Sequence, residues 1–321
     1  MQSLGIDISK DHVHAALLGE GKIAKQSFSN NATGFRQLFK WLANRGVDQV
    51  HACMESTSGL EQPLAVELHN HGHLVSIVNP ALIKHFGQSE GLRTKTDGVD
   101  AALIARFCEL HKPATWTPPS PAEQALQGLE RHRHHLIGVR AQEKTRLQSP
   151  GITDPVRKST RKMIAFLDKS VAEIEDQIKK HIDSDPDLRS KCDLLTTING
   201  IGDTTAKTIL AEAPHLAEFR DVKAVGAYIG ATPKHNQSGK SDKPAHICRT
   251  GNARLRTALY FPAMSAIRYN PTLRAFAQRL EKRGKCPKVI ITAVMRKLLT
   301  IAYGVLKSGR PFEPCPTLVA P

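Results

Sequence analysis

Four acidic residues in the first hundred positions have the side-chain types and surroundings of a metal-binding set. Asp7 lies between two isoleucines in a short apolar run, where a carboxylate is costly unless it meets a metal ion or another partner. Glu55 comes at the end of a second apolar run. Asp97 and Asp100 are three residues apart at the start of an expected helix, so both carboxylates lie on one helix face. If the two apolar runs are neighbouring strands, Asp7 and Glu55 project from the same sheet edge towards that face.

Four carboxylates of this kind indicate a particular chemistry. Hard oxygen ligands suit Mg²⁺, which keeps several of its waters and accepts phosphate oxygens. Two such ions would stabilise the attacking and leaving oxygens of an in-line phosphoryl transfer. A purely structural interpretation stays open, in which Asp97 caps a helix and Asp100 is a first-turn acid favoured by the helix dipole.

A second candidate site is the glycine-bearing turn within residues 195–207. A helix is expected to run into Gly200-Ile-Gly202, and a new helix to start at Asp203 or Thr204. This pattern is typical of helix-hairpin-helix elements, in which free backbone N–H groups at a helix N-terminus bind a phosphate without reading sequence. Asn199 stands where such turns usually have proline. A tight turn between two helices with no ligand is the alternative.

A third candidate is the polar loop expected at residues 232–241. It carries Ser238 and Ser241 among basic residues, and nearby cations together with a metal ion would favour a serine alkoxide that attacks a phosphodiester. Taken alone, the same residues fit an ordinary flexible basic loop. Nucleic-acid contacts are expected at the two glycines of the preceding turn and at four basic residues of this part of the chain: Lys240, Arg249, Arg254 and Arg256.

The distribution of charge favours a polyanionic partner. The net charge is +15, and residues 222–321 alone hold 18 Lys and Arg against 3 acids, whereas the rest of the chain is balanced. A block of this kind suits contacts with a phosphate backbone, although a basic surface that only aids solubility has the same composition. Six scattered cysteines without a C-x-x-C pair argue against a zinc knuckle. With no export signal and no apolar run of membrane-spanning length, the protein is expected to be cytoplasmic.

The elements that position these residues fall into three expected regions. Alternating strands and helices predict an α/β domain, with strands near residues 4–8, 13–18, 23–28, 49–54 and 73–78, and a helix capped by Thr33. A three-strand meander followed by this alternation fits the ribonuclease H-like fold, while periodicity alone supports only the α/β class. Beyond the proline-rich stretch 115–121 the chain is expected to be helical, with an a/d seam at Ile164, Leu167, Val171, Ile174 and Ile178 that fits either a coiled coil or a helix packed on its own domain. The predicted domains are 1–121, 122–187 and a mainly α C-terminal domain, 188–321.

Taken together, these motifs resemble one family, the DEDD transposases of the insertion-sequence-110 group, which are related to Piv-type DNA invertases. The matching segments occur in the family's order along nearly the whole chain: Gly5-Ile6-Asp7, Glu55-Ser56-Thr57, Val78-Asn79-Pro80, Ser89-Glu90-Gly91-Leu92-Arg93, Lys95-Thr96-Asp97-Gly98-Val99-Asp100-Ala101, Gly200-Ile201-Gly202, Thr232-Pro233, Ser238-Gly239 and Leu255-Arg256-Thr257-Ala258-Leu259.

The resemblance implies a RuvC-like first domain in which Asp7, Glu55, Asp97 and Asp100 bind Mg²⁺. It also implies that Ser238, rather than Ser241, is a nucleophile that becomes covalently joined to DNA. Members of this type form tetramers, and relatives are guided by a bridge RNA that pairs with target and donor DNA. The expected function is therefore site-specific recombination between an insertion element and its target.

Three rival interpretations remain. A junction-resolving nuclease would use the same acids and a metal-bound water to hydrolyse DNA, without Ser238. A DNA invertase would recombine DNA without a guide RNA. A structural nucleic-acid-binding protein would use only the Gly200–Gly202 turn and the basic C-terminal block, and would leave the placement of the four acids without a purpose.

Overall fold

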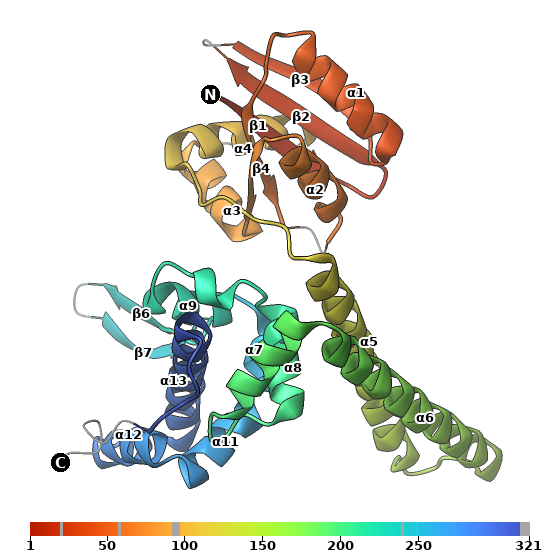
Figure 1. Cartoon of the computed structure of the whole chain (residues 1–321), viewed down its shortest axis with the longest axis vertical. Helices are drawn as coiled ribbons and strands as arrows, with labels where there is room; N and C mark the ends of the chain where they lie inside the picture. Colours follow the sequence, from red (N-terminus) through yellow and green to blue (C-terminus); the bar gives the residue numbers. More distant parts are fainter. Residues whose placement is uncertain (20–21, 57–58, 92–96, 239–240, 249, 315–321) are drawn as a thin grey trace. The chain divides into compact units, whose positions relative to one another are not determined.

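The protein consists of two compact units, residues 1–118 and residues 119–321, and each has its own hydrophobic core (Figure 1). The computed structural model describes most of the chain, namely residues 1–19, 22–56, 59–91, 97–238, 241–248 and 250–314. The predicted boundary at residue 187, between a helical region and a C-terminal domain, stays a prediction.

One mixed sheet of five strands forms the centre of the first unit, in the order β3-β2-β1-β4-β5. β1, β2 and β3 pair antiparallel, as the expected meander requires. β4 pairs parallel with both β1 and β5, because helices connect these strands. The α/β class predicted for this region is therefore confirmed. The strands are β1 Gln2–Ile8, β2 His12–Gly19, β3 Lys22–Ser29, β4 Val50–Glu55 and β5 Leu74–Val78.

Helices cover both faces of this sheet. α1 and α2 pack on the face that carries Leu4 and Ile6, and α3 and α4 pack on the opposite face, which carries Cys53. The cap of α1 differs from expectation, because the side chain of Asn31 rather than Thr33 accepts hydrogen bonds from the first backbone N–H groups of the helix. The four helices are α1 Ala32–Ala43, α2 Gln62–Asn70, α3 Pro80–Ser89 and α4 Asp97–His111.

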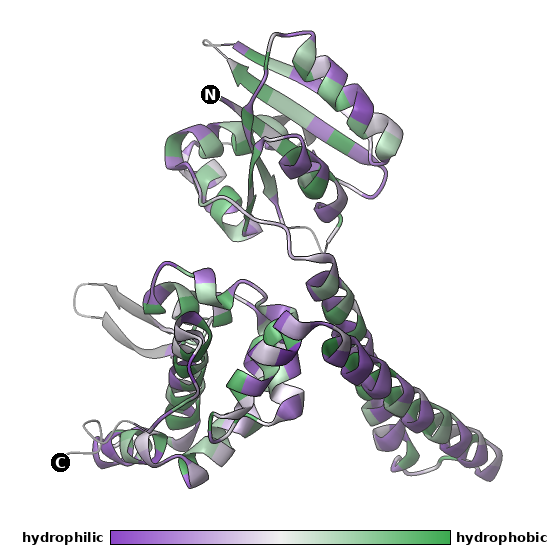
Figure 2. Ribbon diagram, in the orientation of Figure 1, coloured by the Kyte–Doolittle hydropathy of each residue, from purple (hydrophilic) through white to green (hydrophobic). Residues whose placement is uncertain are grey.

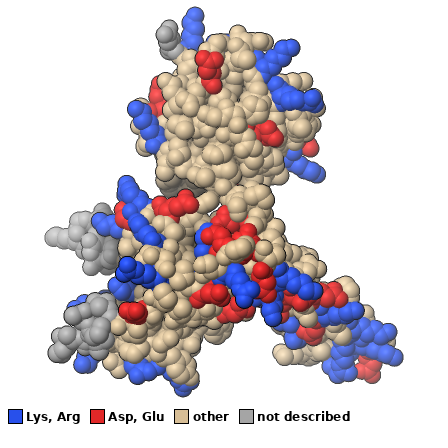
Figure 3. Space-filling model, viewed as in Figure 1, with Lys and Arg blue, Asp and Glu red and all other residues tan. Residues whose placement is uncertain are grey.

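A long helical hairpin opens the second unit. It consists of α5 Pro121–Leu147 and α6 Asp154–Ser184. The two helices are antiparallel, since Arg133 in the middle of α5 pairs with Glu175 on α6, whereas Arg140, further along α5, pairs with Asp168, which comes earlier on α6. Polar residues lie along the outside of both helices (Figure 2), and Lys and Arg are mixed there with Asp and Glu (Figure 3).

The predicted a/d seam lies on the side of α6 that packs against α5. Leu167, Val171 and Ile178 are buried, and Ile164 and Ile174 are half-buried. The seam is therefore filled within the chain. An association of several copies through this region would need another surface of the hairpin.

The rest of the second unit is mainly helical, and α13 packs against α7, α9, α11 and α12. By length and composition alone α13 would reach across a membrane, contrary to the expectation from the sequence. Val294, Leu298 and Ala302 on α13 are fully buried against these neighbours. The elements are α7 Pro186–Thr196, α8 Asp203–Glu212, the short 3-10 helix η1 Leu216–Glu218, α9 Val222–Ile229, β6 Pro233–Ser238, β7 Ser241–Ile247, α10 Ala253–Ala258, α11 Tyr260–Tyr269, α12 Pro271–Lys282 and α13 Pro287–Ser308.

Candidate functional site

Asp7 and Glu55 lie at the ends of two neighbouring parallel strands. The register of β1 and β4 pairs Ile6 with Met54, so the next residue on each strand, Asp7 or Glu55, lies at the carboxyl edge of the sheet. Ile6 and Met54 are fully buried on one face, and successive side chains on a strand alternate between faces. The two half-buried carboxylates therefore project to the other face, as expected from the sequence.

The helix α4 packs directly on that face of the sheet. Gly5 is two residues before Asp7 and shares its face, and a Cβ at Gly5 would lie 2.1 Å from the carbonyl oxygen of Ala101 and 2.2 Å from the backbone nitrogen of Ala105. The helix backbone therefore contacts the strand without an intervening side chain. Only glycine permits this approach, so Gly5 sets the distance between α4 and the acidic edge.

The direction of α4 brings its first turn towards the two strand-end acids. Cys108, in the last turns of the helix, donates a hydrogen bond to the carbonyl of His51 near the start of β4, at 3.4 Å. α4 is therefore antiparallel to β4, and its N-terminal end lies towards the carboxyl edge of the sheet. Asp97 is the first residue of α4 and Asp100 follows within its first turn.

The four predicted acids thus belong to three elements that meet at one edge of the sheet. Within the described ranges, no three His, Cys, Asp or Glu side chains stand close enough together to hold a metal ion. The side chain of Asp97 falls outside those ranges. The donor chemistry fits a hard cation, since every predicted ligand is a carboxylate oxygen.

Two groups beside the acidic edge were not predicted from the sequence. Glu61 is 3% exposed, and its carboxylate accepts hydrogen bonds from the Ser56 hydroxyl at 3.4 Å and from the Gly59 backbone at 3.0 Å, so it holds the residue that directly follows Glu55. The sequence signal that could have identified Glu61 is its position directly before Gln62-Pro63, a pair that opens a helix. A hydrogen bond with Cys108, burial and the neighbouring Glu55 carboxylate all raise the pKa of Cys53, which keeps this thiol protonated.

The turn at Gly200–Gly202 lies between two helices as predicted, since α7 ends at Thr196 and α8 begins at Asp203. Gly200 has φ +113°, and a Cβ there would lie 2.6 Å from the Cβ of Ala266 on α11. Gly200 is therefore required by the packing of the turn against α11. Gly202 is the N-cap of α8, makes no side-chain capping bond and has open space around it. Gly202 thus leaves the N-terminus of α8 accessible, as phosphate binding requires.

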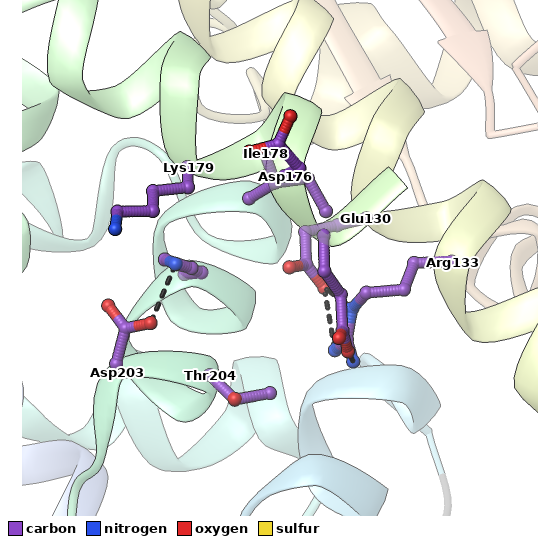
Figure 4. Close-up of a pocket in the computed structure, with 9 residues that line it drawn as sticks. Glu130, Arg133, Asp176, Ile178, Lys179, Asp203 and Thr204 are labelled. Carbon is purple, nitrogen blue, oxygen red and sulfur yellow. Dashed lines mark hydrogen bonds and ion pairs between the residues drawn. The ribbon is translucent and has the colours of Figure 1, made fainter. Parts of the chain in front are cut away.

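A pocket of about 310 Å³ lies beside this turn, between α5, α6 and α8 (Figure 4). Its charged groups are largely paired with each other: Lys207 contacts Asp203 at 2.6 Å, and Arg133 contacts Glu130 at 3.1 Å. The lining contains more acids than bases, so it does not favour an anion. We interpret the pocket as a polar junction of three helices.

Ser238 lies at the tip of a β-hairpin, where the sequence had predicted a loop. β6 ends at Ser238 and β7 begins at Ser241, and these two serines pair with each other across the hairpin. The strands escaped prediction because residues 233–247 lack the alternation of apolar and polar residues that identifies a half-buried strand. Lys240 and Arg249 lie outside the described residues.

Two glycines fix the base of this hairpin to α9. Gly230 and Gly251 both have positive φ, and a Cβ at Gly251 would lie 2.6 Å from the nitrogen of Gly230. The Arg256 guanidinium donates to the carbonyl of Ile229 at 2.9 Å and so holds the end of α9. Arg254 on the same helix, α10, is exposed. Of the two predicted nucleic-acid contacts on α10, Arg254 is therefore the one that faces solvent freely.

A buried carboxylate connects the hairpin base with the helical hairpin α5–α6. Glu212 is 3% exposed and accepts hydrogen bonds from Arg131 on α5 at 3.2 Å and from the side-chain amide of Asn252 at 3.0 Å. Tyr228 donates to the backbone carbonyl of Glu212, and Asn252 caps α10 by accepting from the backbone of Leu255 at 2.9 Å. Glu212 thus holds Asn252, the residue that caps α10.

Two families of known proteins match this chain. Residues 4–150 match a family described as transposase, whose designation includes DEDD and IS110, and residues 192–278 match the family described as transposase IS116/IS110/IS902. The chain therefore belongs to the IS110 family of DEDD transposases and is a DNA-recombining enzyme.

Full-length relatives agree with this assignment and include DNA invertases. The chain is 36% identical over 315 residues to the pilin gene-inverting protein of Moraxella bovis and equally to that of Moraxella lacunata, with 97% of each chain covered. It is 24% identical over 304 residues to a probable family 20 transposase of Pseudomonas aeruginosa, with 84% of this chain and 85% of the relative covered.

Proposed function

We propose that this transposase cuts DNA at the ends of a mobile element and at its target and rejoins the strands through a covalent bond to Ser238. Asp7 and Glu55, side by side at the carboxyl edge of the sheet, carry the proposal, because two adjacent strand-end carboxylates under the first turn of α4 form the start of a cation site. Asp97 and Asp100 would complete it. The strand order and the covered faces support a RuvC-like, ribonuclease H-like fold for this unit.

The acids would hold Mg²⁺, and an ion bound there supplies positive charge to the phosphate oxygens of the DNA backbone. The Ser238 hydroxyl gives up its proton and its oxygen forms a bond to phosphorus. The bond from phosphorus to one deoxyribose oxygen breaks, and that oxygen takes up a proton and leaves as a free hydroxyl. A hydroxyl end of the new partner strand then attacks the phosphoserine and releases the serine, so that no phosphodiester is lost.

The position of Ser238 supports this role. The tip of a two-stranded hairpin projects from its unit, and the base of this hairpin is fixed by Gly230, Gly251 and the Glu212 contacts. A nucleophile at the tip of a hairpin would reach a DNA backbone without the DNA having to enter a buried cleft. The Gly202 end of α8 and exposed Arg254 would contact backbone phosphates of the same DNA; Gly200, Lys240, Arg249 and Arg256 complete the proposed nucleic-acid-binding set.

The test is the behaviour of Ser238→Ala on a DNA that carries the element ends. We expect no strand cleavage and no protein-linked DNA on a denaturing gel, with DNA binding retained. Ser241→Ala is the matched control and should keep the covalent adduct. Normal cleavage by Ser238→Ala, with Asp7→Asn inactive, would contradict the serine recombinase. It would indicate a nuclease that hydrolyses DNA instead.

A guide RNA and a tetrameric assembly belong to the same proposal, on the strength of the family resemblance. One observation favours an alternative without RNA: the relatives matched over their whole length at 36% identity are named as gene-inverting proteins. Sequencing the nucleic acid that copurifies with the protein separates the two. A single structured RNA supports guided recombination, whereas its absence supports a DNA invertase that reads DNA directly. Sedimentation with and without DNA tests the tetramer.

A further inference from the structure

The helix α11 has its large side chains on the outside. Ala263 and Ala266 are fully buried, whereas Phe261, Met264 and Tyr269 are 74%, 45% and 62% exposed. Phe261 and Met264 are three residues apart and so share one face of the helix, and Tyr269 is exposed at its C-terminal end. A helix on the surface of a soluble protein normally has the opposite arrangement, with apolar residues inside and polar residues outside.

The packing of α11 explains the small residues but not the large ones. The turn at Gly200 comes so close to Ala266 that a larger residue at either position would collide. Nothing in this contact requires aromatic residues on the far side. Several large apolar side chains exposed on one element favour an interaction surface. The four exposed apolar side chains Tyr260, Phe261, Met264 and Tyr269 are together called the α11 strip below.

The charge around the α11 strip limits the identity of the partner. Residues 253–308 contain twelve Lys and Arg and a single acid, Glu281. The guanidinium of Arg268 lies 5.9 Å from the ring centre of Tyr269, so a cation and an aromatic face are presented together. A partner that suits both must combine negative charge with flat apolar faces. Nucleic-acid bases on a phosphate backbone have this combination, and they are open to stacking only where they are unpaired.

We propose that the α11 strip binds the unpaired bases of a DNA strand. The inference rests on the proposed function, since a strand that leaves one partner for another passes through an unpaired state. Base stacking on Phe261 and Tyr269 and contact with Met264 would hold the freed strand, while the surrounding cations neutralise its backbone. The bound strand is DNA rather than RNA, because DNA strands are the ones exchanged in recombination.

Fluorescence anisotropy with the full chain tests the proposal, using a labelled DNA strand of mixed sequence, the same strand paired with its complement, and an RNA strand of the same sequence. Phe261→Ala should weaken binding of the single DNA strand by about fivefold or more, since stacking on one base is worth about 1–3 kcal/mol. Binding of the duplex should change little, and Phe261→Trp should restore the affinity. Phe166→Ala, which removes a similarly exposed aromatic residue (66%) from α6, is the matched control and should have no effect.

Salt dependence separates stacking from charge. The loss in Phe261→Ala should persist at high salt, whereas Arg254→Gln should reduce the salt slope by about one unit. Equal loss on single strand and duplex, or a larger loss on RNA than on DNA, would overturn the proposal. So would unchanged affinity of Phe261→Ala accompanied by a change in its sedimentation, which would assign the α11 strip to a second copy of the chain. Ser238→Ala should bind the single strand normally, so a failure of the serine mechanism remains distinguishable from a failure here.

Discussion

The Cα of Gly5 lies against the backbone of α4, so close that a Cβ at this position would meet the carbonyl oxygen of Ala101 at 2.1 Å. This contact places the first turn of α4 directly over the carboxyl ends of β1 and β4. The spacing between the helix-borne acids and Asp7 therefore depends on one missing side chain.

Gly5→Val should destabilise the first unit by more than about 3 kcal/mol, since the clash is with backbone that cannot rotate away. Both tryptophans of the chain, Trp41 and Trp116, belong to this unit, so urea unfolding followed by tryptophan fluorescence reports on it selectively. Gly138→Ala on α5 is the control, because a Cβ there meets open space. It should leave the fluorescence transition unchanged, and a wild-type urea midpoint for Gly5→Val would show that α4 can move away from β1.

Removal of the metal should stop strand cleavage and leave DNA binding intact. We expect no cleavage in a chelator and recovery on addition of Mg²⁺. Asp7→Asn and Glu55→Gln should reduce the cleavage rate by about a thousandfold or more, because the phosphate oxygens lose the charge that stabilises the transition state. Asp48→Asn, which changes an exposed acid of the same unit, should cleave normally. Full cleavage activity in the chelator would show that the four acids do not act through a bound metal ion.

Loss of the Glu212 carboxylate should destabilise the second unit. Glu212→Ala removes the carboxylate that accepts from Arg131 and from the Asn252 amide, although Asn252 keeps the backbone carbonyl of residue 212 as an acceptor. Because the Arg131 side chain is 37% exposed and can be hydrated, the expected cost is about 1–3 kcal/mol. Thermal unfolding followed by circular dichroism at 222 nm measures the effect. The double variant Glu212→Leu, Arg131→Met should recover part of it, since neither charge is then left alone. Glu218→Ala removes an exposed partner of His215 and should cost less than about 0.5 kcal/mol.

The stability of the first unit should fall in mild acid because of His73. Burial and the neighbouring His71 lower the pKa of His73 below the usual 6.5. The folded state therefore binds fewer protons than the unfolded state, and its stability is complete above about pH 6.5 and is lost as the pH falls towards the lowered pKa. Urea midpoints measured by tryptophan fluorescence should drop more steeply below this pH in the wild type than in His73→Phe. Parallel curves for the two proteins would exclude His73 as the cause.

Much of the acidic edge could be predicted from the sequence because it depends on local patterns. Strand alternation placed Asp7 and Glu55, and the i, i+3 spacing placed Asp97 and Asp100 on one turn of a helix. The close approach that joins the two parts could not be predicted, since Gly5 and Ala101 are far apart in the chain and no periodicity couples them. The same holds for Glu212, whose side-chain partners Arg131 and Asn252 come from distant segments.

The second unit shows two further limits of pattern-based prediction. The a/d seam of α6 correctly indicated an apolar face. The helix that covers this face, α5, could not be identified from the sequence, because its own apolar positions are less regular. The strands of the β6–β7 hairpin are largely polar and lack the alternation that signals a strand, so their pairing is visible only in the structure.

The contact between Gly200 and Ala266 has a mechanical consequence. Because the turn and α11 touch without intervening side chains, they cannot shift independently. A phosphate held at the Gly202 end of α8 and a base held on α11 would therefore keep a fixed separation along the bound DNA strand. Any movement of this unit during recombination would carry both attachment points together, and would translate a bound strand without stretching it.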